Sequence, residues 1–198
     1  MWKVNEIFHS LQGEGYNTGT ASVFIRLSGC NLRCSFCDTR HESGTMMSLQ
    51  EIVDKVMQYP LAPWIVLTGG EPSMWIDEAF VENLKAMTGK RIAIETNGTH
   101  TLPQGIDWVT LSPKNGIGNC GEVPIVLDHC DELKVVYEGT EQDMSQYDVI
   151  QAKEYRLQPC CTGDRQKDTF ITNQTIDYIL THPKWRLSLQ THKILGVR

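Results

Sequence analysis

Long apolar runs are missing from this 198-residue sequence, so no segment is predicted to span a membrane. Blocks of like charge are also missing, and the net charge of −6 argues against a nucleic-acid binder, which would carry a basic stripe. The N-terminus lacks the charged and then apolar plan of a signal peptide. Internal repeats and low-complexity linkers are absent. We therefore expect a single cytoplasmic domain over residues 1–198, without nucleic-acid or membrane partners.

A disulfide framework is also disfavoured, because seven cysteines, an odd number, suit a reducing compartment. Three of them, Cys30, Cys34 and Cys37, form the pattern C-x3-C-x2-C. Thiolates suit zinc or iron–sulfur clusters, but a structural zinc site takes four protein ligands and a cubane cluster usually takes four cysteines. Three ligands without a fourth favour a cluster with one iron open to a small molecule. The alternatives are a zinc loop completed by His41 or a distant residue, and three unrelated core cysteines.

The other four cysteines make no metal-ligand pattern, although two of them are adjacent. They are Cys120, Cys130, Cys160 and Cys161. Free cysteine behaves as a small apolar side chain and is often buried. We expect these four to pack in the interior or to be partly exposed, and the sequence assigns them no role.

Short apolar runs without polar alternation recur along the chain, and most end in a polar or glycine-rich signature. Runs of this kind are typical of buried parallel strands. The predicted strands are Val23–Leu27, Trp64–Leu67, Arg91–Ile94, Trp108–Leu111, Leu133–Val136 and Tyr155–Leu157. Because the carboxyl ends of parallel strands meet at one edge of a sheet, the signatures that follow them are expected to build one active site.

Three helices are predicted from apolar residues at helical spacing, over 49–57, 80–87 and 176–180. Ser48 and Glu51 form a predicted capping box at the start of the first helix. Asp77 is the predicted N-cap of the second helix, and Gly89 lies just past its end. Thr172 or Asn173 is the predicted N-cap of the third helix, which ends by Pro183. The alternation of strands and helices favours an α/β fold. A full eight-stranded barrel of typical size does not fit this length, so we expect a partial (β/α) barrel of about six parallel strands.

The cysteine loop, followed by Gly69-Gly-Glu-Pro72 at the next strand end, resembles the radical S-adenosylmethionine (SAM) superfamily. A set of shorter motifs, running in order from residue 11 almost to the last residue, resembles the 7-carboxy-7-deazaguanine synthase family within it. These motifs are Leu11-Gln-Gly-Glu-Gly15, Phe24-Ile-Arg-Leu27, Cys37-Asp-Thr39, Glu95-Thr-Asn-Gly98, Ser112-Pro-Lys114, Leu157-Gln-Pro159 and Gln190-Thr-His-Lys193. Each motif alone is weak, but their joint order is highly specific.

The resemblance implies an abbreviated radical SAM core and a carbon–nitrogen lyase. The family converts 6-carboxy-5,6,7,8-tetrahydropterin to 7-carboxy-7-deazaguanine with loss of ammonia, on the route to queuosine and other 7-deazapurines. Its implied cofactors are a 4Fe-4S cluster, SAM and Mg²⁺. One electron from the cluster cleaves SAM to a radical that takes a hydrogen atom from the pterin. The implied partners are an electron donor such as flavodoxin or ferredoxin, and a second copy of the chain in a homodimer.

The resemblance also implies roles for the residues that match the family motifs. Cys30, Cys34 and Cys37 would hold the cluster, and Thr39 would bind Mg²⁺ together with the substrate carboxylate. The residues implied for SAM are Phe36, Asp38, Gly70, Glu71, Ser112, Lys114 and Gln158. The residues implied for the pterin are Leu11, Gln12, Gly13, Glu14, Arg26, Thr68, Glu95, His192 and Arg198, with Glu95 and Arg26 as the catalytic residues. Many members of the family end in proline where this sequence ends in Arg198.

Considered without the family, several of these residues have a plainer interpretation. Arg26 lies in an otherwise apolar strand, where a guanidinium needs either a structural ion pair or a carboxylate of the substrate. Glu95 is also consistent with an exposed loop carboxylate or a helix cap, and Thr39 is also consistent with a helix N-cap. Lys114 and His192 are residue types that are mostly or partly exposed.

Two other functions stay open at this point. A small glycyl-radical activating enzyme would share the cysteine loop but would act on a protein. A zinc-loop interaction protein or an electron carrier would need only the cysteines. The motifs Leu11–Gly15 and Gln190–Lys193 argue against the first, because they form a small-molecule pocket in the resembling family. The convergent polar signatures at the strand ends argue against the second.

Overall fold

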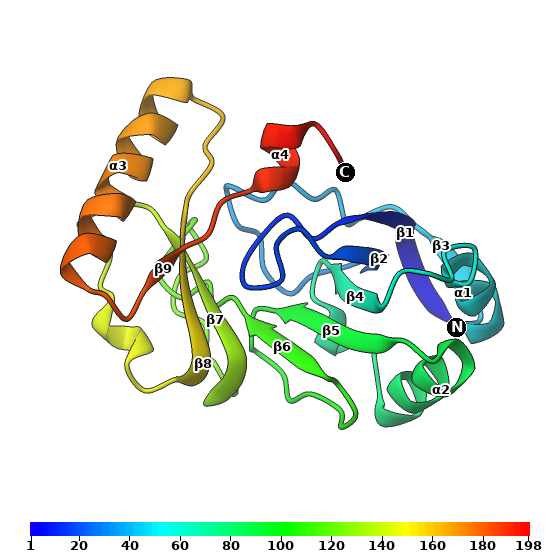
Figure 1. Cartoon of the computed structure of the whole chain (residues 1–198). Helices are drawn as coiled ribbons and strands as arrows, with labels where there is room; N and C mark the ends of the chain where they lie inside the picture. The colour runs from blue at the N-terminus through cyan, green and yellow to red at the C-terminus, as the bar shows by residue number, and fades with distance from the viewer.

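A single mixed β-sheet organises the computed structural model, which describes all residues, 1–198. Its nine strands lie in the order β3-β1-β2-β4-β5-β6-β7-β8-β9, so the sheet is open and its two edges do not meet (Figure 1). The strands are β1 Trp2–Leu11, β2 Ala21–Leu27, β3 Thr45–Met47, β4 Trp64–Gly69, β5 Arg91–Thr96, β6 Trp108–Leu111, β7 His129–Tyr137, β8 Gln151–Pro159 and β9 Arg186–Leu187. The strands from β2 to β8, leaving out β3, are the six predicted ones, and all pair in parallel.

Helices lie at both ends of the sheet and above it (Figure 1). The α-helices are α1 Leu49–Val56, α2 Glu78–Thr88, α3 Arg165–Thr181 and α4 Thr191–Leu195, and the 3-10 turns are η1 Pro72–Met74 and η2 Ser145–Tyr147. The predicted caps of the first two helices are confirmed. Ser48 and Glu51 form the capping box of α1. Asp77 accepts a hydrogen bond from the Phe80 amide at the start of α2, and Gly89 ends that helix with a φ of 66°. None of the helices has both the length and the apolar character needed to cross a membrane.

One face of the sheet packs in the apolar core and the other lines a cavity. Successive side chains along each strand point to opposite faces. In β2, Ile25 and Leu27 belong to the apolar core that α1 and α2 cover. Phe24 and Arg26 point to the opposite face, where they line a cavity. A second core lies between β7, β8 and α3 and includes the fully buried Tyr137. Burial on both faces explains why the strands have no polar alternation.

Five strands and helices differ from the prediction. β1 and the short edge strands β3 and β9 are additional, and β1 pairs antiparallel with β2. The third helix was predicted to begin near Thr172, but it begins at Arg165, where the Asp164 carboxylate accepts hydrogen bonds from two backbone amides. Only Ile171 and Thr175 of α3 are buried. Most of this helix therefore lacks apolar residues at helical spacing, which is the pattern that would have predicted it. α4 was not predicted, and its five residues lie within the motif Gln190–Lys193 and just beyond it.

Candidate active site

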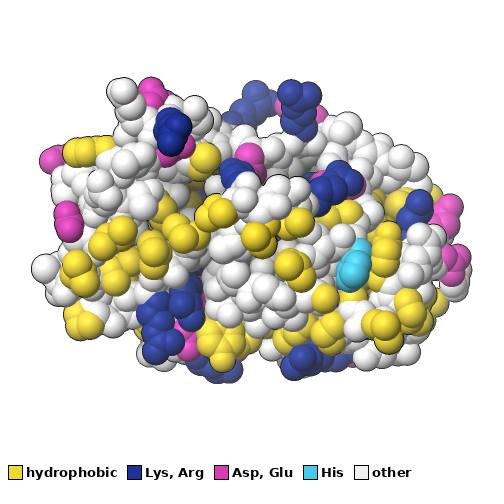
Figure 2. Space-filling model, turned by 45° about the horizontal axis from the view of Figure 1, so that its top comes forward, with side chains coloured by type: hydrophobic (Ala, Val, Ile, Leu, Met, Phe, Trp, Pro, Cys, Tyr) yellow, Lys and Arg dark blue, Asp and Glu magenta, His cyan; other side chains and the backbone are white.

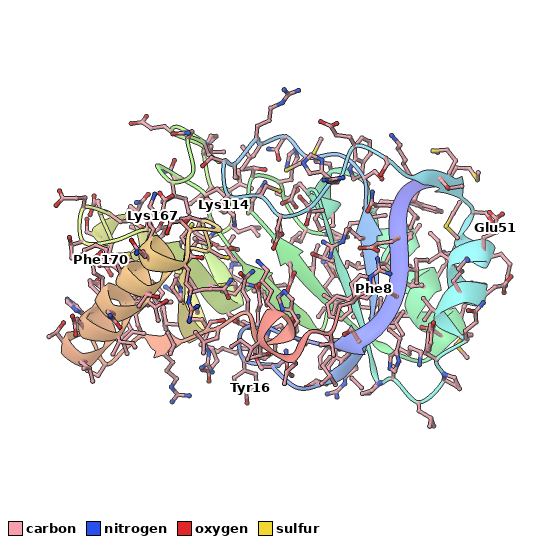
Figure 3. The ribbon with its side chains drawn as sticks, turned by 90° about the horizontal axis from the view of Figure 1, so that it is seen from above. Phe8, Tyr16, Glu51, Lys114, Lys167 and Phe170 are labelled. Carbon is pink, nitrogen blue, oxygen red and sulfur yellow. The ribbon has the colours of Figure 1, made fainter.

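A cavity of about 290 Å³ opens at the carboxyl ends of the parallel strands. Every residue assigned above to the cluster, to SAM, to Mg²⁺ or to the pterin lines it, from Leu11 to Arg198. Figure 2 shows a hollow in this surface with Lys and Arg side chains beside it, and Figure 3 shows Lys114 and Phe8 from above. The structure therefore brings the predicted site together, whereas the role of each residue stays a prediction.

The cysteine loop that follows β2 is held against the loop that follows β4. The Gly29 amide donates to the His41 carbonyl (2.8 Å), and the Glu71 amide donates to the Gly29 carbonyl (2.9 Å). The three thiols of the motif are free and are partly to fully exposed, and all of them line the cavity. Burial is the largest cause that raises the pKa of Cys30, and it also raises the pKa of Cys34, to about 12. Binding of iron would therefore displace protons from these thiols.

The donor set fits a cluster better than a single metal ion. No three side chains among His, Cys, Asp and Glu surround one point at which they could hold a single ion. A cubane cluster places each cysteine on a different iron atom, so its ligands are spread apart. Three thiols on one loop beside a polar cavity match that requirement.

The carboxylate of Glu71, the acidic residue of the Gly-Gly-Glu-Pro motif, is hydrogen-bonded to other groups of the protein. Its carboxylate accepts hydrogen bonds from the backbone and hydroxyl of Ser73, from the Thr96 hydroxyl (2.7 Å) and from the Asn97 amide (2.7 Å). Glu71 is 1% exposed, and these bonds tie the end of β4 to the end of β5. Its side chain thus shapes the loop that carries Gly70, and the loop offers a ligand mainly its backbone groups.

A chain of polar side chains crosses the floor of the cavity. Gln12 Nε2 donates to Glu95 Oε1 (3.1 Å), and the Thr68 hydroxyl donates to Glu95 Oε2 (2.9 Å). Lys134 Nζ lies 2.5 Å from Glu14 Oε2 and 3.6 Å from Glu95 Oε1, with a side chain that is only 6% exposed. Glu95 is therefore an oriented carboxylate in the cavity, and the alternative of an exposed loop residue is wrong. Lys134 is the cation that the two glutamates share.

The charges of this network depend on one another. Burial alone would raise the pKa of Glu14, but the charge of Lys134 and hydrogen bonds from Lys134 and Gln190 outweigh it and lower the pKa to about 2. Burial alone would lower the pKa of Lys134, but the carboxylates of Glu14, Glu95 and Glu132 together raise it. The floor of the cavity therefore holds the ionised Glu14 carboxylate beside the Lys134 ammonium group at neutral pH.

Arg26 makes the structural ion pair that its sequence left open, and its role toward a substrate carboxylate stays a prediction. Its Nε donates to Glu6 Oε1 (2.9 Å), which is the structural ion pair, and its Nη1 donates to the Thr39 hydroxyl (3.0 Å). Its side chain is 22% exposed and lines the cavity, so the guanidinium also reaches the space where a ligand would lie. Asp38, next to Thr39, pairs with Lys193 (3.0 Å).

Comparison with known proteins decides the family. Residues 24–132, more than half of the chain, match the Radical SAM superfamily. The 7-carboxy-7-deazaguanine synthase of Bacteroides thetaiotaomicron is 54% identical over 198 residues, which is the whole of both proteins. That of Bradyrhizobium diazoefficiens is 38% identical and covers 100% of this chain and 99% of its own. This chain belongs to the 7-carboxy-7-deazaguanine synthase family of the radical SAM superfamily.

Structural similarity supports the same family. The crystal structure of QueE from Escherichia coli has a TM-score of 0.75 and 28% identity to this chain, covering 96% of it and 94% of the QueE chain. The expected α/β fold with an open, partial barrel is confirmed by this likeness and by the order of the strands. The superfamily implies a 4Fe-4S cluster and SAM, so the cysteine loop of this 7-carboxy-7-deazaguanine synthase relative has a defined cofactor class.

The remaining residues implied for SAM lie on the side of the cavity formed by β6 and β8. Lys114 Nζ donates to both the backbone oxygen (2.6 Å) and the hydroxyl (2.7 Å) of Ser112, and burial lowers the pKa of Lys114. Its ammonium is therefore turned inward, and the alternative of a solvated surface lysine is wrong. Gln158 is buried and accepts a hydrogen bond from the Ser188 hydroxyl (2.8 Å), which leaves its amide nitrogen available to a ligand.

The C-terminal segment closes the cavity on the side of β1. Thr191 donates to the Gly13 carbonyl through its amide and its hydroxyl, and Gln190 Nε2 donates to Glu14 Oε1 (2.7 Å). His192 lies so close to Gly13 that a Cβ there would overlap the imidazole. Arg198 pairs with Glu6, and its main-chain oxygen accepts a hydrogen bond from Ser10. The last residue thus lies at the cavity, as expected from the family.

Lys134, which lines the cavity, and Glu6, which pairs with Arg26 behind it, were missed from the sequence, and Gln190 was named only as part of a motif. A signal existed for Lys134, because it interrupts the apolar run Leu133–Val136 just as Arg26 interrupts its own strand. A charged residue inside a buried strand requires a partner. Glu6 carried no comparable signal, because the strand that contains it was not predicted.

Proposed function

We propose that this chain converts 6-carboxy-5,6,7,8-tetrahydropterin to 7-carboxy-7-deazaguanine and ammonia in 7-deazapurine (queuosine) biosynthesis. The observation that carries the proposal is full-length similarity to 7-carboxy-7-deazaguanine synthases, joined to a polar cavity at the cysteine loop. A glycyl-radical activating enzyme fits less well, because the motifs Leu11–Gly15 and Gln190–Lys193 are hydrogen-bonded to each other and together close one side of the cavity. Cys30, Cys34 and Cys37 would hold the cluster, which would supply the electron for SAM cleavage and so allow abstraction of a hydrogen atom from the substrate.

The chain's own residues bind and orient the substrate. The carboxyl groups of Glu14 and Glu95 can accept hydrogen bonds from the guanidine-like edge of the pterin. The Arg26 guanidinium can donate to the pterin carboxylate, a geometry that suits arginine. Lys134 holds the two glutamates in place and stays protonated. The side chains that line the cavity position the substrate, while the bound cofactors would supply the bond-making chemistry.

The decisive experiment is an anaerobic assay of reconstituted protein with SAM, dithionite and 6-carboxytetrahydropterin, followed by mass spectrometry. We expect 7-carboxy-7-deazaguanine to form with SAM largely conserved. Cys34→Ala is expected to lose the cluster absorbance and all turnover. Full turnover by Cys34→Ala would contradict the cluster assignment, and SAM cleavage without the product would reopen the substrate.

Thr39 is proposed to bind Mg²⁺ together with waters and the substrate carboxylate. Its hydroxyl accepts a hydrogen bond from Arg26, which orients it toward the cavity (3.0 Å). Thr39→Val is expected to raise the Mg²⁺ concentration for half-maximal turnover by about tenfold or more. A magnesium titration of turnover measures this, with Thr181→Val on the exposed side of α3 as the control. An unchanged titration would remove Thr39 from the metal site.

The partners follow from the same proposal. A single radical SAM domain over residues 1–198 would work in the cytoplasm as a homodimer, with a flavodoxin or ferredoxin as the electron donor. The superfamily chemistry requires an external one-electron donor, which supports this part of the proposal. Sedimentation analysis of the purified protein and reduction of its cluster by a purified flavodoxin test the two statements separately.

A further inference from the structure

The loop of residues 115–124 is docked on the cysteine loop. The Ser35 amide donates to the Gly118 carbonyl (2.8 Å). Gly118 lies against Phe36 so closely that a Cβ there would overlap the ring. Ile117 is 1% exposed and packs with Phe36 in a small apolar cluster. A backbone hydrogen bond and two packing contacts thus fix one loop against the other.

This docking brings Cys120 against a cluster ligand. Cys120 Sγ lies 2.8 Å from Cys34 Sγ, although the two residues are 86 positions apart. The Cys120 amide donates to the Ile117 carbonyl (2.9 Å), so Cys120 is the last residue of a hydrogen-bonded turn. The expectation that Cys120 only packs or is partly exposed is therefore incomplete. By contrast, Cys130 and Cys160 are buried in apolar clusters, and Cys161 is exposed.

We propose that Cys34 and Cys120 form a reversible disulfide when the cluster is absent. In this reaction the two thiols pass two electrons and two protons to a low-molecular-weight disulfide such as oxidised glutathione. One sulfur–sulfur bond forms between Cys34 and Cys120, and the bond in glutathione disulfide breaks to give two glutathione thiols. The proposal rests on Cys34 being a cluster ligand, but it does not depend on the pterin reaction.

Two consequences follow for the protein. The disulfide removes one of three cluster ligands, so iron and sulfide can be inserted only after reduction. It also keeps Cys34 from the irreversible sulfinic and sulfonic states that exposed thiols reach under oxidation, because a neighbouring thiol traps the earlier sulfenic state. Cys120 would act in this way as a resolving cysteine for the cluster loop.

The test uses full-length protein from which the cluster has been removed, treated anaerobically with oxidised glutathione and mapped by peptide mass spectrometry. We expect a Cys34–Cys120 peptide that has lost two hydrogen atoms and is restored by dithiothreitol. Cys120→Ser should give no such peptide and should leave a glutathione adduct on Cys34. Cys161→Ser, which changes an exposed cysteine whose thiol faces Asp168 (3.6 Å), should keep the wild-type disulfide. Pairing of Cys34 with Cys30 or Cys37, or no internal disulfide, would overturn the proposal.

A second measurement separates this role from that of a fourth cluster ligand. Oxidised wild-type protein should take up no cluster, as judged by its visible absorbance, until it is reduced. Reduced Cys120→Ser should reconstitute as fully as reduced wild type. A folded Cys120→Ser protein that cannot hold the cluster would make Cys120 a ligand and overturn the proposal. Failure of the pterin reaction in an assay would leave all of these results unchanged.

Discussion

Lys134→Met is expected to lower the free energy of unfolding by about 3–5 kcal/mol and to abolish detectable binding of 6-carboxypterin. Lys134 is the cation that Glu14 and Glu95 share, at 2.5 and 3.6 Å, on the buried floor of the cavity. Removing one partner of a buried ion pair leaves an uncompensated charge, which costs more than the pair contributes. Methionine has a similar length and no charge, so the variant tests the charge more than the packing.

The effect of Lys134→Met should depend on pH. Because the pKa of Glu14 is about 2 in the folded protein and 4.5 ordinarily, the pair stabilises the fold fully above pH 4.5 and loses this effect as the pH falls toward 2. In Lys134→Met the pKa of Glu14 should rise, since burial then acts unopposed. The variant should therefore be least stable, relative to wild type, near neutral pH. Urea unfolding at a series of pH values measures this.

Lys153→Met is the matched control. Lys153 also pairs with an acidic residue, Asp131 at 2.6 Å, but its side chain is 76% exposed. An exposed pair of this kind contributes at most about 1 kcal/mol and lies outside the cavity. Binding of 6-carboxypterin by calorimetry should be unchanged in Lys153→Met. Equal effects of the two substitutions on stability and binding would show that Lys134 is not the centre of the network.

Gly70→Ala is expected to prevent assembly of the cluster while the chain still folds. A Cβ on Gly70 would overlap the Gly29 carbonyl and the backbone nitrogen of Cys30. Neither group can move aside like a flexible side chain, because the Gly29 carbonyl also accepts the Glu71 amide. The substitution would push the cysteine loop away from β4, at a cost of about 1–3 kcal/mol of stability.

Iron and sulfide content after reconstitution, together with a thermal unfolding curve, measures the effect of Gly70→Ala. We expect little or no bound iron and a folded protein. Gly163→Ala is the control, because its φ of 83° strains alanine but nothing lies within 4 Å of the added Cβ. A full complement of cluster in Gly70→Ala would show that the cysteine loop does not need this close contact.

The parts of the fold predicted from the sequence are those that depend on near neighbours. The six parallel strands are short β-branched runs, and the caps at Ser48 and Asp77 act within three residues. The strand β1 was missed, because its residues are only partly buried and mix polar with apolar side chains. The start of α3 at Arg165 was missed because an exposed helix has no apolar period.

The sequence by itself determined the family and predicted the cluster ligands and the residues that line the cavity, because spacing along one loop and motif order are local properties. Only the tertiary structure decided which partner each buried charge takes: Arg26 meets Glu6 across β1 and β2, and Lys134 meets Glu14 across 120 positions. The same holds for Cys120, which reaches Cys34 because two loops dock. A buried charge or thiol accepts any suitable group that the fold brings within reach, so its partner follows from packing and not from the residue's own neighbours.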